Sequence, residues 1–289
     1  MERISISAWP RPSRLSGRRS RSAPREALPQ QWAMTQNNLG NALQAQGIRT
    51  SGEAGAKLLS KAVAVFQAAQ EVYTRESLPQ QWAVTQHNLA RAYTALEDWP
   101  KAAASYAELL HANLDDGEAY QKAGWLYHEK LSDFGAAFAL NQQWLERHPE
   151  DLSVQGDFAE RHFTTGRFVE AKERLAALLA NPALDPQIRI GLQALEIAAL
   201  LALNDTRAVP QRLERLRAAV QSRPQDFQVG WLFAGSKHFI ATDPRLVPHW
   251  AWLQTLFTAL ESENRDAILA ALDGVREKLT QREGDPVPD

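Results

Sequence analysis

The sequence predicts an all-α protein in which helical hairpins stack into a solenoid, and three observations support this fold class. A segment of nineteen residues that begins at Arg25 recurs from Arg75 with thirteen identical positions. Apolar residues recur at helical spacing from residue 28 to about residue 184, and no segment alternates as a strand does. Repeats of this length cannot bury their own apolar faces, so they stabilise one another by stacking.

Composition narrows the class of protein. The chain has 289 residues, of which 44% are hydrophobic and 23% are charged. No apolar run approaches the roughly 18 residues that cross a bilayer. The absence of cysteine excludes disulfides, thiolate metal sites and thiol nucleophiles. We therefore expect a cytoplasmic protein with no membrane partner.

Residues 1–24 form a Ser/Arg/Pro-rich basic arm, for which a disordered tail is the favoured interpretation. Contact with nucleic acid or a membrane, and a targeting peptide, are the alternatives. Pro10, Pro12 and Gly17 interrupt the amphipathic face that a targeting peptide needs. Nucleic acid would be a partner only through this arm. The arm joins the first repeat without a capping element, which also fits a start inside a longer repeat array.

Turn signals divide residues 25–184 into helices of about 12 to 20 residues. A capping-box pattern over residues 77–80 has proline in the first turn and predicts a helix start near residue 78. The predicted breaks lie at Gly47, at residues 98–100, 115–117 and 148–151, at Gly166, and at residues 181–182.

Residues 151–182 resemble the tetratricopeptide repeat, a helical hairpin of roughly 34 residues. Gly166 occupies the turn of that repeat, Ala171 the close contact between helices, Leu175 the buried knob and Pro182 the end. The resemblance extends over residues 25–184 and implies a right-handed α-solenoid with a concave, ligand-binding groove.

The spacing of three core positions agrees with this resemblance. Leu89 and Ala123 are 34 residues apart, and Ala123 and Phe158 are 35 apart. The first repeat is longer, with about ten extra residues expected in the turn around residues 50–55. In this it resembles the lengthened repeats of kinesin light chains and of bacterial signalling proteins. Small residues should let paired helices approach closely, namely Gly40, Ala62, Ala102, Gly124 and Ala171.

Residues 185–289 should close the array. Residues 192–203 and 209–220 read as a degenerate repeat whose second helix opens at Pro210. The aromatic-rich remainder contains a helix at Trp250 and Trp252 and a final helix over residues 264–279, and we expect it to cap the open end of the stack.

No enzyme motif is complete. Residues 47–57 are rich in glycine but lack the adjacent Gly-Lys-Ser/Thr of a phosphate-binding loop. His128 and Glu129 begin like a zinc-binding helix, yet the second histidine one turn later is missing. The seven histidines lack ligand spacing, so we expect no catalytic residue, no metal and no cofactor.

The resemblance implies that the first helix of each repeat lines the groove. If Leu39, Leu89, Ala123 and Phe158 point into the core, the residues one before and two after them face the groove. The candidate groove residues are Asn37, Asn38, Asn41, His87, Asn88, Arg91, Lys122 and Trp125, followed by Asp157 and Glu160.

Asparagine amides donate and accept hydrogen bonds and can hold the main chain of an extended peptide, while Arg91 and Lys122 would favour an acidic ligand. The alternative is that these asparagines serve packing and hydrogen bonding between repeats. Family members that clamp a carboxylate have lysine at the position of Asn37, so only part of that clamp is present. Trp32 and Trp82 begin their helices and read as core staples.

These features favour a non-enzymatic scaffold that binds a peptide or partner domain in the groove. The alternative is the sensor segment of a bacterial signalling or defence effector whose catalytic domain lies elsewhere.

Overall fold

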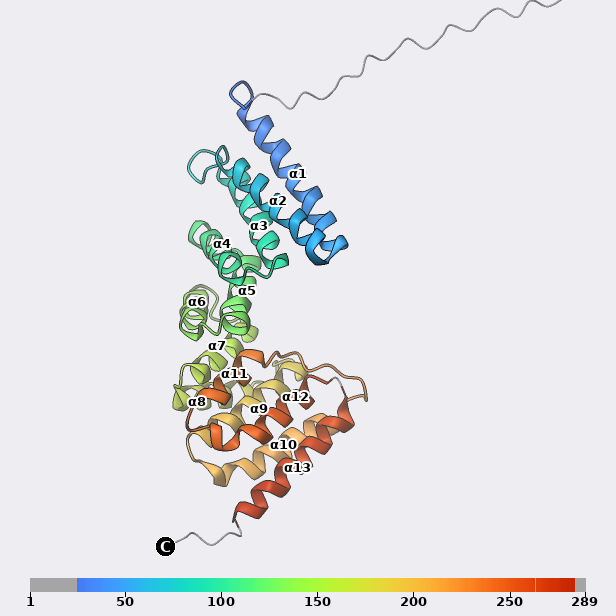
Figure 1. The fold of residues 1–289 in the computed structure, drawn as a ribbon. Coiled ribbons are helices and arrows are strands. Elements are labelled where there is room, and N and C mark those ends of the chain that lie inside the picture. The colour runs from blue at the N-terminus through green and yellow to red at the C-terminus, as the bar shows by residue number, and fades with distance from the viewer. Residues whose placement is uncertain (1–24, 263, 284–289) are drawn as a thin grey trace, which may run out of the picture. The chain divides into compact units, whose positions relative to one another are not determined.

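The computed structural model describes residues 25–262 and 264–283, and the predicted basic arm lies outside them (Figure 1). Within the described residues all regular structure is helical, which confirms the all-α prediction there. The chain divides into two compact units, with the boundary between Ala92 and Tyr93. Each unit is described by itself.

The helices follow one another with short connections. Their bounds are α1 (Pro29–Thr50), α2 (Gly52–Gln70), α3 (Pro79–Ala95), α4 (Trp99–Ala112), α5 (Gly117–Trp125), α6 (Phe134–Arg147), α7 (Leu152–Thr164), α8 (Phe168–Ala180), α9 (Pro186–Ala202), α10 (Val209–Gln221), α11 (Ala234–Thr242), α12 (Trp250–Leu260) and α13 (Arg265–Glu283). A π-helix, η1 (Leu126–Lys130), continues α5, and two short 3-10 helices are η2 (Thr206–Ala208) and η3 (Val247–His249).

In the first unit, α1 and α2 cross closely because glycines occupy the contact. A Cβ atom on Gly40 would lie 2.4 Å from Cε1 of the buried Phe66 ring. A Cβ atom on Gly55 would lie 2.6 Å from the carbonyl oxygen of Gly47. The expected role of Gly40 is therefore confirmed.

Two expectations for this hairpin were wrong. Gly47 does not end a helix, since α1 runs on to Thr50, and the extra residues do not form a long turn. Ser51, at φ 52°, links α1 directly to α2. The inserted residues instead lengthen both helices, because the glycine contact lets them remain packed up to the turn.

Trp32 and Trp82 pack, partly buried, against the small core formed by Ala33, Ala69 and Tyr73. The Tyr73 hydroxyl also donates a hydrogen bond of 3.1 Å to the carbonyl oxygen of Gln30. The prediction that the two tryptophans serve the core is confirmed for this unit.

In the second unit, aspartates begin five of the helices, among them Asp185 at the start of α9, which accepts from the Ile188 N–H over 3.2 Å. Each accepts a hydrogen bond from the backbone N–H three residues later, which satisfies a group that the helix leaves without a partner. The other bonds are 3.4 Å for Asp98, 3.0 Å for Asp116, 3.0 Å for Asp133 and 3.1 Å for Asp151. Gly166, at φ 75°, forms the turn between α7 and α8. The predicted breaks of this region are confirmed, and they leave helices that pack mainly against sequential neighbours.

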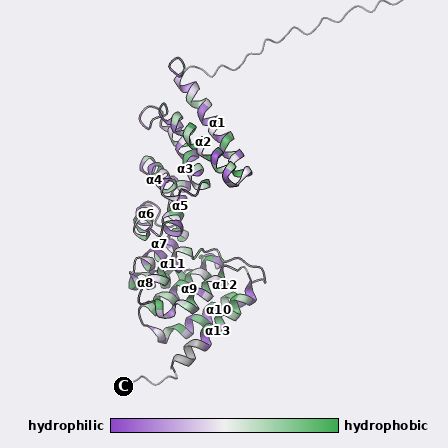
Figure 2. Ribbon diagram, in the orientation of Figure 1, coloured by the Kyte–Doolittle hydropathy of each residue, from purple (hydrophilic) through white to green (hydrophobic). Residues whose placement is uncertain are grey.

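The main hydrophobic core of the second unit lies in its C-terminal part. Helix α9 is buried without interruption from Ile190 to Ala202 and packs against α8, α10 and α12. Helices α9 and α10 form the predicted pair, and α12 and α13 contribute Leu253, Phe257 and Ile268 to the same core. Elsewhere hydrophobic and hydrophilic residues alternate along the helices (Figure 2), as expected for helices that bury one face.

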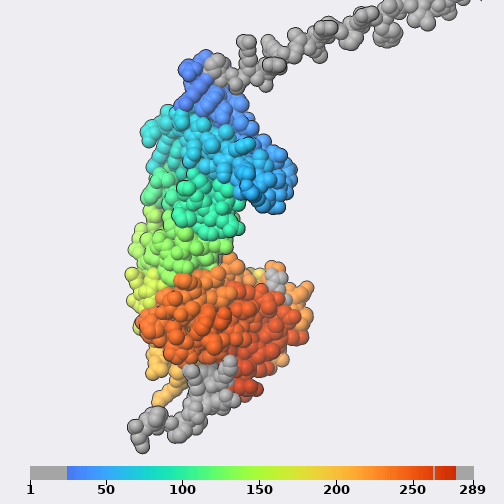
Figure 3. Space-filling view, in the orientation of Figure 1, coloured from blue at the N-terminus to red at the C-terminus, as the bar shows by residue number. Residues whose placement is uncertain are grey.

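Helices α11 to α13 form a continuous body in the space-filling view, where they are orange to red (Figure 3). Gly191 admits Trp231 to this core, since a Cβ atom there would lie 2.5 Å from Cβ of Trp231. No helix among the described residues combines the length and apolarity that crossing a membrane requires.

Candidate functional site

The first unit brings two of the predicted groove asparagines together. The side-chain nitrogen of Asn88 donates a hydrogen bond of 3.1 Å to the side-chain oxygen of Asn37, so the amides connect α3 with α1. Both side chains are half-buried, as is His87, whereas Asn38 and Asn41 are exposed.

Arg91 is also exposed. The core position that served to place the groove on α1 was wrong, because Leu39 is 45% exposed while its counterpart Leu89 is 6% exposed. Gly40, one residue later, occupies the buried position against Phe66.

A pocket of about 530 Å³ lies between α1 and α3 beside this pair of asparagines. Equivalent residues from both copies of the duplicated segment line this one pocket. These are Gln30 with Gln80, Gln31 with Gln81, and Met34 with Val84. Asn37, Tyr73 and Thr85 complete the polar lining. Met34 and Val84 are 53% and 56% exposed, so the pocket offers apolar contacts flanked by amides.

The remaining predicted residues, Lys122 and Trp125, belong to the second unit. Lys122 is exposed on α5. Trp125 is half-buried and meets Trp99 edge to face, with ring centroids 6.1 Å apart. The Lys130 ammonium lies 5.0 Å and 5.1 Å from the centroids of these two rings, within the range of cation–π attraction.

Trp125 also lines a second cavity, of about 240 Å³, in the second unit. Tyr120 and Trp231 form further walls of this cavity. Its charged groups are Glu129 from η1 and Asp157, Glu160 and Arg161 from α7. Asp157 and Glu160 are the two acidic residues that the spacing placed in the groove.

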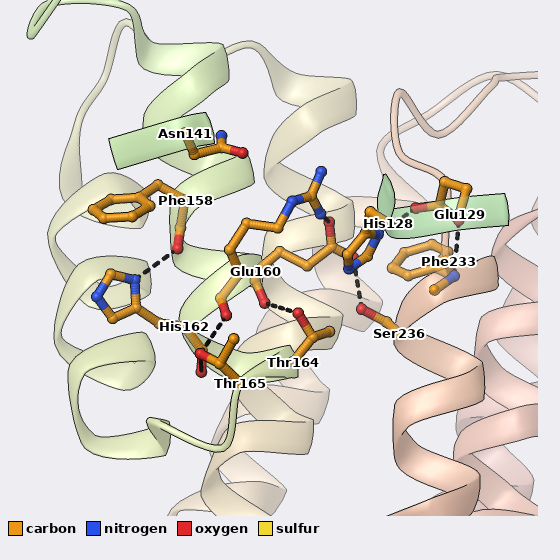
Figure 4. Close-up of polar contacts among 12 residues, drawn as sticks. His128, Glu129, Asn141, Phe158, Glu160, His162, Thr164, Thr165, Phe233 and Ser236 are labelled. Carbon is orange, nitrogen blue, oxygen red and sulfur yellow. Dashed lines mark hydrogen bonds and ion pairs between the residues drawn. The ribbon is translucent and has the colours of Figure 1, made fainter. Parts of the chain in front are cut away.

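Glu129 and Glu160 belong to a buried cluster with His128 (Figure 4). One potential ligand atom from each of the three lies within 4.8 Å of the others. Nδ1 of His128 is 2.6 Å from Oε1 of Glu129, and the side chain of His128 is fully buried. Among the described residues, this group combines residue types that bind metals with ligand atoms close enough together that it could hold an ion.

Hydrogen bonds fix both carboxylates. The backbone N–H of Gly235 donates to Glu129 over 2.8 Å, and the Ser236 hydroxyl donates to Glu160 over 2.6 Å. Nη1 of Arg161 donates to the other oxygen of Glu160 over 2.8 Å. Because α11 supplies two of these donors, the cluster joins α7, η1 and α11.

Burial sets the protonation of these groups. Burial lowers the pKa of His128 to about 3, with the positive charge of Arg161 acting in the same direction, so the imidazole is neutral. Burial raises the pKa of Glu129, Glu160 and Asp157 above the usual carboxyl values. The arrangement therefore offers a neutral imidazole and carboxylates that gain from a cation.

The sequence did not indicate this cluster because its members come from two elements, η1 and α7, that are distant in the chain. His128 and Glu129 lacked a second histidine one turn later, and the third member of the cluster is Glu160, 31 positions further along the chain than Glu129. The π-helix η1 was the other unrecognised feature. Its wider turn is visible in the bond of 2.9 Å from the Leu131 N–H to the Leu126 carbonyl, five residues back.

No family model matches the chain, and no curated protein matches it either.

Proposed function

We propose that this protein is a non-enzymatic scaffold of tetratricopeptide-like hairpins, stacked as a right-handed solenoid, which binds an extended peptide along α1 and α3. The observation that supports this most directly is the amide-lined pocket of the first unit. Its lining repeats the pattern Gln-Gln-x-x-Met/Val from both copies of the duplicated segment. Two equivalent surfaces side by side suit a ligand that is itself repetitive, as an extended main chain is.

The chemistry of the lining favours backbone recognition. Four glutamines and Asn37 can each donate and accept, which matches the alternating N–H and C=O groups of an extended peptide. Met34 and Val84 then supply apolar anchors at the surface. The hydrogen bond between Asn37 and Asn88 uses one donor of Asn88 and holds both amides in place, so bonding between repeats and ligand binding are compatible roles.

A peptide-display selection against the full chain tests this function. Selected peptides should bind the wild type. Fluorescence anisotropy should show that Met34→Lys and Val84→Lys each weaken this binding by more than about tenfold, because the loss of a central anchor commonly costs about 2 kcal/mol or more. Val169→Lys is the matched control because Val169 is 51% exposed on α8, in the other unit.

The proposal fails if no peptide is selected, or if both groove variants bind selected peptides as tightly as the control does. Circular dichroism verifies that all three variants remain helical, so that weaker binding is attributable to the groove.

A further inference from the structure

We propose that His128, Glu129 and Glu160 bind one divalent transition-metal ion of the zinc class, with one ligand atom from each residue. The ligand atoms already lie within 4.8 Å of one another, so small side-chain rotations bring them to ordinary coordination distances of roughly 2.0–2.2 Å around one ion. One imidazole and two carboxylates suit zinc, manganese or cobalt better than calcium or magnesium.

The imidazole of His128 supplies the nitrogen ligand of the site. Its side chain is fully buried, and its Nε2 atom has no hydrogen-bond partner. Nδ1 faces Glu129 at 2.6 Å, which fixes the ring. Figure 4 shows this ring between the carboxylates of Glu129 and Glu160. An ion that also binds Glu129 would take Nδ1, in place of the contact between Nδ1 and that carboxylate, because Nε2 points away from Glu129.

The groups around the three ligands form the outer shell that metal sites require. Ligating carboxylates are normally held by further hydrogen bonds, which orient them. Here the Gly235 N–H holds Glu129, and Ser236 with Arg161 holds Glu160. Each carboxylate oxygen has two lone pairs and can accept one of these bonds while binding an ion.

Charge balance favours a divalent ion. Glu129, Asp157 and Glu160 carry three negative charges when ionised, and Arg161 supplies one positive charge among the charged groups lining the cavity. The remaining two negative charges equal the charge of one divalent cation. Buried charges require such compensation because the interior solvates them poorly.

The cavity supplies access and the remaining ligands. Glu129 and Glu160 both line it, so an ion can reach them from the 240 Å³ space. Nε of Arg161 and Nε1 of Trp231 are buried donors without partners on its wall. A water molecule bound to the ion from the cavity side would offer these donors an oxygen atom.

Protons bound to the carboxylates could neutralise the negative charge of the cluster instead of a metal ion. The following experiment distinguishes bound protons from a bound metal ion. The full chain, without an affinity tag, is stripped with a chelator and titrated with zinc or cobalt at pH 7 by isothermal calorimetry, with the metal content checked by elemental analysis. We expect one ion per chain, a rise of several degrees in Tm, and absorption bands of protein-bound cobalt.

Three variants test the assignment. Glu129→Gln and His128→Gln should weaken zinc binding by more than about tenfold, as should Glu160→Gln, because each removes a ligand. His238→Gln, at an exposed position of α11, is the matched control and should bind as the wild type does. Glu160→Gln can also lower stability, because it leaves Arg161 without its charged partner. If that variant does not fold, the test rests on the number of zinc ions bound per wild-type chain and on the affinity of Glu129→Gln for zinc.

Wild-type protein that takes up no zinc, or that binds it as tightly as Glu129→Gln and His128→Gln do, would overturn the proposal. The first result would leave protons as the balancing charge, and the second would place the ion elsewhere. Neither result bears on peptide binding by the first unit.

Discussion

At the scale of single residues, the closest contacts involve glycines whose importance the sequence only partly shows. Gly40 was predicted to permit a close approach, and the Phe66 ring lies where its side chain would be. Gly124 was given the same role, yet a Cβ atom there would meet Leu140 at an ordinary 3.8 Å. The repeat pattern identifies small residues, but the identity of the residue across the contact decides which of them must stay small.

Gly40→Ala should destabilise the protein by about 1–3 kcal/mol, because the new methyl group would overlap the buried ring of Phe66. Urea unfolding measures the change. Gly274→Ala is the matched control, since nothing lies within 4 Å of a Cβ atom there and alanine favours a helix, so it should stabilise slightly. If both variants were equally stable, the Phe66 ring would have to move aside for the new methyl group at little energetic cost.

The carboxylate of Asp243 should make the folding stability of the protein change with pH in the acid range. Arg245 bonds its carboxylate over 3.0 Å and 2.7 Å, and these bonds hold the pKa of Asp243 below its usual value. The stability that this pair contributes is present above the unfolded pKa of about 3.9 and is lost as the pH falls through the lower folded value.

Asp243→Asn should therefore lower the free energy of unfolding by about 1–2 kcal/mol at pH 7, and the difference from wild type should shrink below about pH 4. Urea unfolding at pH 7 and pH 3 measures it, with Glu108→Gln on the exposed face of α4 as control. A difference that stays constant with pH would contradict the role of the carboxylate.

At the scale of helices, local chemistry made most boundaries predictable. Asp98, Asp116 and Asp151 each cap the helix that the sequence places after them, and Gly166 has the positive φ that its turn requires. The turn after α1 and the π-helix η1 were not predictable, because they depend on how neighbouring helices pack. The same holds for the cluster at His128, whose partners come from α7 and α11.

Asp151→Ala should cost about 1 kcal/mol of stability, because the N–H of Val154 loses its 3.1 Å acceptor at the start of α7. Asp151→Asn retains a hydrogen-bond acceptor at the same place, so it should change the free energy of unfolding by only about a few tenths of a kcal/mol. Thermal unfolding compares the two, and a loss of the same size in both would assign the effect to charge instead of capping.

At the scale of the whole molecule, the two units differ in how much core they contain. The second unit holds one large cluster that includes Leu195, Phe233 and Leu256, whereas the cluster around Ala33 and Tyr73 in the first unit is small. The sequence indicated that residues beyond 184 end the repeat pattern. It did not show that they supply most of the large core of the second unit, because the segments that pair there are far apart in the chain.

Separate expression of the two units should show this difference. Residues 93–289 should form a helical domain with a cooperative thermal transition, because all residues of the large hydrophobic core lie within this unit. Residues 25–92 should melt at lower temperature and with a broader transition, because they bury less apolar surface. Circular dichroism measures both, and a second unit that stays unfolded alone would contradict the division.

The π-turn at residues 126–130 also bears on how the chain changes over evolutionary time. A π-turn corresponds to one residue more than an α-helix needs over the same rise. Loss of a single codon there would restore regular winding, because the remaining residues would match the number that an α-helix needs over the same rise. If the lost residue were His128 or Glu129, the cluster with Glu160 would lose one of its members in the same genetic step. The irregular winding and the acidic cluster can thus be lost together.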